Sequence, residues 1–185
     1  MDGLESTPEE NFVDERRDWR EEVVRTIIAE QQITAHNDCY GFLRGDEMLR
    51  CLARVLSRIL PTLSAEAKLG HIGGDDFVIV SLATVGAEAV GTLCRQFDRA
   101  KIEMFDPADV ARGFFRATDR RGQEVEVPLV TLSVAVVPCE AAQTADHPGA
   151  LAQMAASLKR KVKEMTTASR KSEFLFERRG LRPVS

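Results

Sequence analysis

The chain has 185 residues, of which 44% are hydrophobic, so it is long enough and apolar enough to bury the core of one domain. Its 25 basic and 29 acidic residues give a formal net charge of -4. This balance excludes a general nucleic-acid binder, because such proteins owe their affinity to many basic side chains that neutralise phosphates. A pocket for one nucleotide, which needs only a few local cations, is compatible with this charge.

The four cysteines indicate reduced thiols rather than disulfides or a zinc site. They are scattered along the chain, with no Cys-x-x-Cys pair and no histidine nearby at zinc-binding spacing. No apolar stretch reaches the length of a membrane span, and the polar N-terminus differs from a secretory signal. We therefore expect a cytoplasmic protein with no nucleic-acid partner and no membrane segment of its own.

The N-terminal part of the chain is the hardest to assign. Residues 1–20 are predicted to be a polar lead or helix, residues 21–178 a single domain, and residues 179–185 a short tail. At the start of the domain, the apolar residues have the spacing of a helix face, whereas the run Val-Val-Arg-Thr-Ile-Ile is also typical of a short strand. Residues 22–32 are therefore left open as strand or helix.

The middle of the chain alternates helices with strands. An apolar stripe over Gly45–Leu60 predicts an amphipathic helix that ends at Pro61. Two apolar segments, Ala67–Ile72 and Phe77–Leu82, flank a Gly-Gly turn and predict a β-hairpin. The segment Gly86–Phe97 follows as a second helix.

The last third of the chain continues this alternation. Segments Phe114–Thr118 and Glu124–Val127 surround a polar turn and predict a second, exposed hairpin. The almost continuous apolar run Leu129–Val137 is typical of a strand buried on both faces. An amphipathic helix over Leu151–Met165 and an edge strand at Phe174–Phe176 complete the pattern. The order of elements predicts an α/β sandwich with a mixed central sheet.

The densest chemical signal is the turn that contains Gly73, Gly74, Asp75 and Asp76. The two glycines permit a tight turn and let a phosphate or a metal approach the backbone. The two carboxylates are hard oxygen ligands, and magnesium is usually held by one or two carboxylates together with substrate phosphates. Taken alone, the turn is more typical of an ordinary hairpin with solvated acids, since Gly and Asp are common turn residues.

A second candidate site lies upstream, where Asn37 and Asp46 flank a glycine-containing loop that leads into a helix. An amide both donates and accepts, and a carboxylate accepts from ring N-H and amino groups together, which is the pattern that guanine displays. The structural alternative for Asp46 is a place in the first helical turn, where its charge meets the helix dipole. Each residue alone favours the structural alternative.

In combination, these motifs resemble the GGDEF family of diguanylate cyclases. The resemblance extends over roughly 23–176 and rests on the order and spacing of Asn-Asp-x-Tyr-Gly, Gly-Asp-x-x-Leu, Gly-Gly-Asp-Asp-Phe and Leu-Ser-Val-Ala-Val-Val. It implies a palm-like mixed central β-sheet with flanking helices and a β-hairpin that carries the Gly-Gly-Asp-Asp-Phe turn. It also implies that the domain binds GTP, and that two domains meet head to head so that each 3′-hydroxyl attacks the other nucleotide's α-phosphate.

The resemblance assigns roles to six residues of these motifs. Asn37 and Asp46 match the pair that contacts guanine, and Gly73 and Gly74 match the turn on the phosphate side. Asp75 matches a metal ligand, and Asp76 matches the acidic neighbour that is catalytic if the domain is active. Magnesium is implied only where a nucleoside triphosphate is bound.

The resemblance also implies a lysine that reaches the phosphates from the late helix. Lys163 falls at that position and is assigned to nucleotide binding. Lys159, Arg160 and Lys161 lie close to it in sequence, and a basic run on a helix is usually a solvated face.

The chain departs from the family at its first metal ligand. The family places a metal-binding Asp eight residues before the asparagine that matches Asn37, and this sequence has Ala29 there. Alanine cannot ligate a metal, so Asp75 is expected opposite Ala29, where working members hold a second carboxylate. The neighbouring Glu30 would point to the other side of a strand, because successive side chains alternate.

Further departures lie around the turn. His71 stands where an arginine commonly precedes the turn, Phe42 where a histidine commonly follows the loop glycine, and Asp76 is one methylene shorter than the usual Glu. The inhibitory Arg-x-x-Asp that many members carry would fall at 64–67, which lacks both charges. Product inhibition through that site is therefore not expected.

Three functions are compatible with this pattern. The first is a degenerate GGDEF signalling domain, catalytically inactive, that binds GTP or cyclic di-GMP and acts through a protein partner or a homodimer. Phosphoryl transfer of this type depends on positioning and on metal-borne charge neutralisation, so losing a metal ligand reduces turnover far more than folding. The second is an active diguanylate cyclase that converts two GTP to cyclic di-GMP, with Glu30 or another acid as the replacement ligand. The third is a protein-interaction domain without nucleotide.

Overall fold

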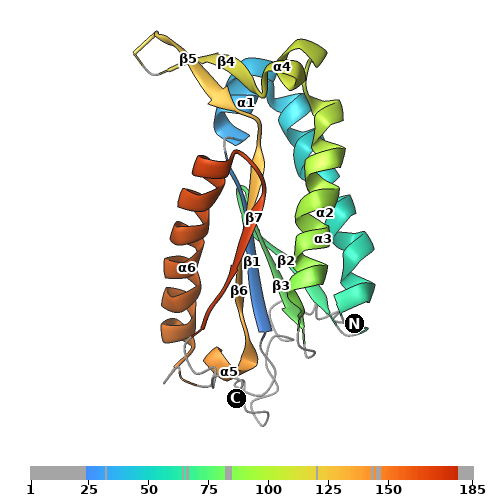
Figure 1. Ribbon diagram of the computed structural model, residues 1–185, viewed down its shortest axis with the longest axis vertical. Helices are drawn as coiled ribbons and strands as arrows, with labels where there is room; N and C mark the ends of the chain where they lie inside the picture. The colour runs from blue at the N-terminus through green and yellow to red at the C-terminus, as the bar shows by residue number, and fades with distance from the viewer. Residues whose placement is uncertain are drawn as a thin grey trace, which may run out of the picture.

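The fold is described from a computed structural model, shown in Figure 1. The described residues are 24–31, 33–63, 65, 67–81, 85–119, 121–142, 144 and 147–178. The predicted lead at 1–20 and the predicted tail at 179–185 lie outside these residues, so both stay predictions.

A five-stranded sheet forms the centre of the domain, with the strand order β2-β3-β1-β6-β7. The last two strands are parallel, whereas the other neighbours are antiparallel, so the predicted mixed sheet is confirmed. Both strands of the hairpin that carries the Gly-Gly turn are present as predicted. The bounds are β1 Val24–Gln31, β2 Lys68–Gly73, β3 Asp76–Ser81, β6 Thr131–Val137 and β7 Glu173–Phe176.

Within the segment that the sequence left open between strand and helix, the described residues Val24–Gln31 form a strand. β1 is hydrogen-bonded to β3 on one side and to β6 on the other, so it is the central strand of the sheet. Its β-branched residues suit a pleated, buried position, although their spacing suits a helix face equally well. Pairing with β3 and β6 favours the strand over the helix, because a central strand forms backbone hydrogen bonds on both edges.

Helices cover both faces of the sheet. Figure 1 shows α2 (Phe42–Leu63) and α3 (Ala87–Ala100) side by side on one face and α6 (Pro148–Ser169) on the other. The hairpin of β4 and β5 projects at one end of the long axis, beside α1 and α4. The remaining elements are α1 Ile33–Tyr40, η1 Lys101–Met104, α4 Pro107–Arg112, β4 Phe114–Thr118, β5 Glu124–Pro128 and α5 Cys139–Ala142.

Because side chains alternate along a strand, they point in turn to the α2 and α3 face and to the α6 face of the sheet. In β3, Phe77 and Ile79 are buried in the main core with residues of α2 and α3, whereas Asp76, Val78 and Val80 are only half-buried. All residues of β6 are buried, as the sequence predicts for a strand covered on both faces. The half-buried row of β3 therefore leaves part of the α6 side of the sheet accessible.

The helix predicted to end at Pro61 begins earlier and ends later than expected. α2 starts at Phe42 and continues through Pro61 to Leu63. Proline lacks one backbone N-H and its ring crowds the preceding turn, and both costs are smallest in a last turn that faces solvent. Pro61 is exposed and lies two residues before the end of the helix.

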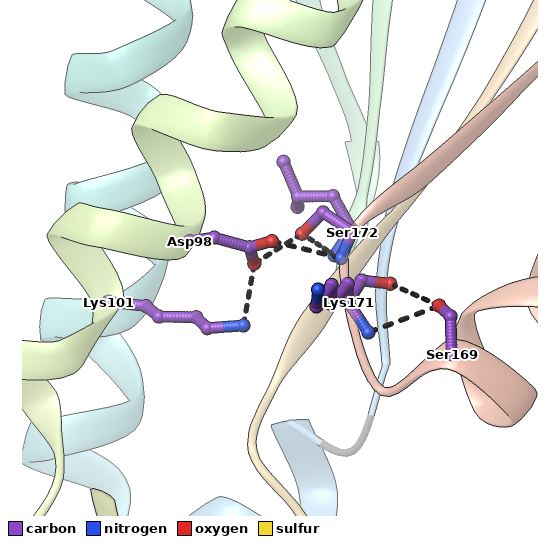
Figure 2. A network of polar contacts seen from close by, with 6 residues as sticks. Asp98, Lys101, Ser169, Lys171 and Ser172 are labelled. Carbon is purple, nitrogen blue, oxygen red and sulfur yellow. Dashed lines mark hydrogen bonds and ion pairs between the residues drawn. The ribbon is translucent and has the colours of Figure 1, made fainter. Parts of the chain in front are cut away.

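A network of polar contacts fixes the end of α3 to the start of β7 (Figure 2). The Asp98 carboxylate accepts hydrogen bonds from Lys101 Nζ at 2.6 Å, from Ser172 Oγ at 2.7 Å and from the Ser172 backbone N-H at 3.1 Å. The Ser172 hydroxyl in turn accepts from the Leu132 N-H of β6 at 2.9 Å. This cluster, called the Asp98 corner below, joins three elements that are far apart in sequence.

Within the part of the chain that the structure describes, no helix is both long enough and apolar enough to cross a membrane.

Candidate functional site

The predicted guanine pair lies where α1 ends and α2 begins. Gly41 separates the two helices with a left-handed φ of 85°, and its N-H donates to the Asn37 carbonyl at 2.8 Å. A positive φ is easy for glycine, so the sequence here forms two helices where we predicted a loop and one helix. Asn37 therefore lies on α1, and Asp46 on α2.

The Asn37 amide is packed against the backbone of α2 at Gly45. A Cβ at position 45 would collide with Asn37 Oδ1, so this arrangement requires glycine at that position. Asn37 Oδ1 is also buried, and it has no hydrogen-bond partner among the described residues. Buried polar atoms are nearly always paired, so this unpaired oxygen is unusual, and it lies at the predicted base site.

Asp46 follows Gly45 and is exposed, with Arg50 Nη2 at 3.9 Å from its carboxylate. It is the fifth residue of α2, and the first turn of this helix holds no acidic residue. The alternative role of Asp46 at the positive end of the helix dipole is therefore wrong, because the helix begins earlier than the sequence indicates. The carboxylate is accessible to a ligand, and its role in base recognition stays a prediction.

Buried aromatic contacts hold α1 in place. His36 is fully buried, and its ring packs against Tyr40, Phe105 and Phe115 at centroid distances of 4.9, 5.1 and 6.2 Å. Burial lowers the pKa of His36, so the imidazole is neutral in the folded protein near pH 7. The Tyr40 hydroxyl donates to the Asp109 carboxylate, and burial together with this bond raises the pKa of Tyr40. These contacts position Asn37 on the same helix.

The Gly-Gly turn is held by His71 and by the conformation of Gly74. Gly74 has a φ of 59°, which favours glycine, and its carbonyl lies 3.0 Å from His71 Nε2. The His71 ring stacks on Phe77 with 4.6 Å between centroids. Gly73 is the last residue of β2 and pairs with Asp76. The residue that replaces the family's common arginine thus stabilises the turn itself.

The expectation that Asp75 lies opposite Ala29 is wrong. In the register of the sheet, Ala29 pairs with Asp76 on β3 and with Ser133 on β6. Asp75 lies in the turn, before β3 begins. Residues directly opposite in an antiparallel pair have Cβ atoms about 5 Å apart, so an acid at position 29 would lie beside Asp76.

Asp76 is instead paired with a lysine from the other side of the sheet. Lys159 Nζ on α6 lies 2.6 Å from both Asp76 oxygens. The Lys159 side chain is 19% exposed and that of Asp76 30%, so the pair is largely withdrawn from solvent. The sequence had placed Lys159 in a run typical of a solvated face. The fold brings these two residues, 83 apart in the sequence, into contact beside the Gly-Gly turn.

Lys163 lies one helical turn beyond Lys159 on α6 and is half-buried, whereas Arg160 and Lys161 are exposed. Residues four apart share one face of a helix, so Lys159 and Lys163 both belong to the face that covers the sheet. The assignment of Lys163 to the phosphates stays a prediction.

The residues at the turn do not fit a magnesium site of the family's kind. Position 29 offers no ligand, and Asp76 is already bonded through both oxygens to an ammonium group. Among the described residues, no group of three His, Cys, Asp or Glu side chains is placed to hold a metal ion. The Asp75 carboxylate alone supplies too few protein ligands for a stable divalent site without substrate phosphates.

A separate groove of about 410 Å³ lies between α2 and α3. None of the residues predicted for the nucleotide site lines it. Its lining residues are Val55, Arg58, Ile59, Thr62, Thr92, Gln96, Arg99 and Ala100.

No protein-family model matches the sequence, and no curated protein matches it either. Solved structures are similar to it in fold. The active GGEEF domain of a diguanylate cyclase from Vibrio cholerae has 20% identity and a TM-score of 0.54, with 85% of this chain and 83% of that chain covered. The GGDEF domain of DgcB from Caulobacter crescentus, in complex with c-di-GMP, has 14% identity and a TM-score of 0.50, with 83% and 77% covered.

The diguanylate cyclase SiaD from Pseudomonas aeruginosa, in complex with its activator SiaC, has 16% identity and a TM-score of 0.53. The match covers 85% of this chain and 50% of SiaD, so this chain spans about half of that protein. These likenesses show that the chain has the fold of GGDEF diguanylate cyclase domains, as its motifs predict.

Proposed function

We propose that this domain is a non-catalytic GGDEF signalling domain that binds a guanine nucleotide and transmits its bound state to a protein partner. One observation supports the loss of catalysis. Position 29, which pairs with Asp76 in the sheet, is alanine, so it provides no second carboxylate beside the turn. Metal-assisted phosphoryl transfer needs that carboxylate to hold the ion against the triphosphate. Its loss is expected to reduce turnover by roughly three orders of magnitude or more.

The retained base site supports nucleotide binding. Asn37 Oδ1 is buried and vacant, Asp46 is exposed one residue after Gly45, and glycine at 45 is required for the amide to lie where it does. A guanine ring N-H and amino group would satisfy an acceptor of this kind.

An active cyclase with Glu30 as replacement ligand finds no support in the register. Glu30 pairs with Leu132, and Leu132 belongs to the main core shared with α2 and α3. Position 30 therefore alternates to the sheet face opposite Lys159 and Asp76.

The protein partner is supported by two exposed apolar residues beside the base site. Phe42 and Leu43 open α2 and are 77% and 81% exposed. Adjacent large apolar side chains on a surface are typical of contact sites. The likeness to SiaD, which binds an activator protein, agrees with such a role.

The test is an incubation of the purified protein with GTP and magnesium, followed by chromatography, together with calorimetric titration of GTP. We expect GTP binding and no cyclic di-GMP. The Ala29→Asp variant is the matched control, because it restores the missing acid opposite Asp76 and changes nothing else in the sequence. Accumulation of cyclic di-GMP by the wild type, but not by Asp75→Ala, would refute the loss of catalysis. The absence of any nucleotide heat would instead favour the pure interaction domain.

A further inference from the structure

The groove between α2 and α3 combines an apolar floor with an arginine on each side. Val55 and Ile59 of α2 line it and are only 5% and 4% exposed, so they form its floor. Arg58 of α2 and Arg99 of α3 line the groove from the two helices, and both are exposed. The groove has a volume of about 410 Å³ and lies in the helix layer on the sheet face opposite α6.

The positive charge beside this groove is not balanced by neighbouring acids. From Met48 to Leu63, α2 contains three arginines and no acidic residue. Among the described residues, no ion pair involves Arg58 or Arg99. Asp98, which precedes Arg99 on α3, is already bonded within the Asp98 corner. Two unpaired arginines beside apolar side chains suit an acidic segment that also carries apolar residues.

The N-terminal part of the sequence has the complementary pattern. Residues 1–15 include six acidic residues and no Lys or Arg. Within them, residues 9–15 read Glu-Glu-Asn-Phe-Val-Asp-Glu, so the apolar pair Phe12 and Val13 lies between two pairs of acids. A carboxylate matches the two-pronged geometry of a guanidinium group, and the apolar pair can cover the floor between the two arginines.

We infer that the groove between α2 and α3 is the docking site of the chain's own acidic N-terminal segment, residues 9–15. The carboxylates of this segment pair with Arg58 and Arg99, and Phe12 covers the apolar floor. The inference does not rest on the proposed nucleotide binding, because no residue predicted for the nucleotide site lines the groove.

The connection to the domain is long enough for this contact. Val24 pairs with Ser81 at the end of β3, and α3 begins six residues later at Ala87. Figure 1 shows the start of β1 and the start of α3 at the same end of the domain. Residues 16–23 can span up to about 26 Å, whereas the whole of α3 is about 21 Å long. The segment can therefore reach the groove of its own chain.

The short connection makes even a weak contact sufficient. A segment joined by a short linker has an effective concentration of about 1 mM at its site. A contact with a dissociation constant of about 0.1 mM between separate molecules would therefore form in about nine-tenths of the chains. Exposed ion pairs are screened by salt, so the docked fraction is expected to fall as the salt concentration rises toward about 1 M.

NMR spectra of the full chain test the docking. The neutralised variant used for comparison carries Glu9→Gln, Glu10→Gln, Asp14→Asn and Glu15→Gln. We expect its amide signals to differ from those of the wild type at Arg58, Thr92 and Gln96, and the differences to shrink in about 1 M NaCl. Glu124→Gln with Glu126→Gln, on the exposed side of β5, is the matched control and should leave these signals unchanged. Unchanged groove signals in the neutralised variant would overturn the inference.

A synthetic peptide of residues 1–15 tests the same contact between separate molecules. Added to the neutralised variant at about millimolar concentration, it should return the groove signals to their wild-type positions. Arg58→Gln with Arg99→Gln, introduced into the neutralised variant, should weaken peptide binding at least about tenfold. Arg160→Gln with Lys161→Gln, at exposed positions of α6, should leave it unchanged. A peptide with Phe12→Ser should bind more weakly than the original, and equal binding would overturn the apolar part of the contact.

Other occupants of the groove give different results. Wild-type groove signals that move with protein concentration would show that the segment docks on a second copy, which would overturn the contact within one chain. Larger shifts of the groove signals by GTP or cyclic di-GMP than by the peptide, at equal concentration, would identify a nucleotide site and overturn the inference. Dispersed amide signals in every variant distinguish lost docking from a failure to fold.

Discussion

Among the described residues, two aspartate–lysine pairs lie on opposite faces of the sheet, Asp98 of α3 with Lys101 and Asp76 of β3 with Lys159 of α6, and they differ in what else bonds to the carboxylate. Asp98 on the α3 side accepts from Lys101 and twice from Ser172, whereas Asp76 on the α6 side is bonded to Lys159 alone among the described residues. Lys101 is 5% exposed and Lys159 is 19% exposed. Both pairs have the same 2.6 Å distance between nitrogen and oxygen.

The difference indicates which pair is structural. At the Asp98 corner every acceptor has a donor from another element, so the carboxylate has little capacity left for a ligand. At the turn, both Asp76 oxygens are bonded to one ammonium group, so this carboxylate depends on Lys159 alone, and Asn37 Oδ1 on α1 has no hydrogen-bond partner among the described residues.

The largest effect is expected from breaking the Asp98 corner. Asp98→Ala leaves the buried Lys101 ammonium unpaired and removes the acceptor of Ser172, so the free energy of unfolding should fall by about 3 kcal/mol. Urea denaturation measures this change. Adding Lys101→Met to Asp98→Ala should recover part of the loss, because the unpaired charge is then gone. A loss below about 1 kcal/mol would mean that the corner is not structural.

Gly45→Ala tests the predicted base site around Asn37, and it should affect binding rather than stability. The new Cβ displaces the Asn37 amide, so GTP affinity should fall at least about tenfold, or roughly 1.4 kcal/mol. The free energy of unfolding should change little, because the gain of about 1 kcal/mol from alanine in a helix offsets the cost of displacing the Asn37 side chain. Calorimetry and urea denaturation give the two values. Gly86→Ala, at a position where a Cβ meets open space, is the matched control and should leave GTP affinity unchanged.

Asp76→Asn sharpens the comparison with Asp98 directly. The Asp76–Lys159 pair is more exposed than the Asp98–Lys101 pair, and no third group bonds to its carboxylate among the described residues, so losing it should reduce the free energy of unfolding by only about 1 kcal/mol. Asp98→Asn, the same substitution at the saturated pair, should cost more in the same urea experiment. If the two variants were equally destabilised, hydrogen-bond saturation would not separate the two pairs.

The pH dependence of the free energy of unfolding should reveal the buried imidazole of His36 on α1. Burial lowers the pKa of His36, while the Met104 carbonyl partly opposes this effect and Arg44 adds to it. The unfolded chain therefore binds more protons below about pH 6.5, its ordinary pKa. The stability that the neutral His36 contributes is fully present above that pH, and it is lost as the pH falls toward the lowered pKa of His36. Urea denaturation of wild type and His36→Phe, at about pH 7.5 and about pH 5.5, should show a smaller decrease in the variant.

Much of the fold was predictable because it depends on local patterns. The apolar stripe of α2, the alternation around the Gly-Gly turn and the continuous apolar run of β6 each state their own structure through side-chain periodicity. The boundary of α1 and α2 was not predictable in this way, because Gly41 permits both a loop and a sharp break between helices.

The site was predictable only in part, for the same reason. The sequence by itself determined the absence of an acid at Ala29 and the presence of Asn37, Asp46, Asp75 and Asp76, since these are facts of residue type at a given spacing. Only the tertiary structure decided that β1 is a strand, that Ala29 pairs with Asp76 rather than Asp75, and that Lys159 bonds to Asp76. Register and long-range contacts depend on which strands and helices pack together, and a pattern of neighbours along one chain does not contain that information.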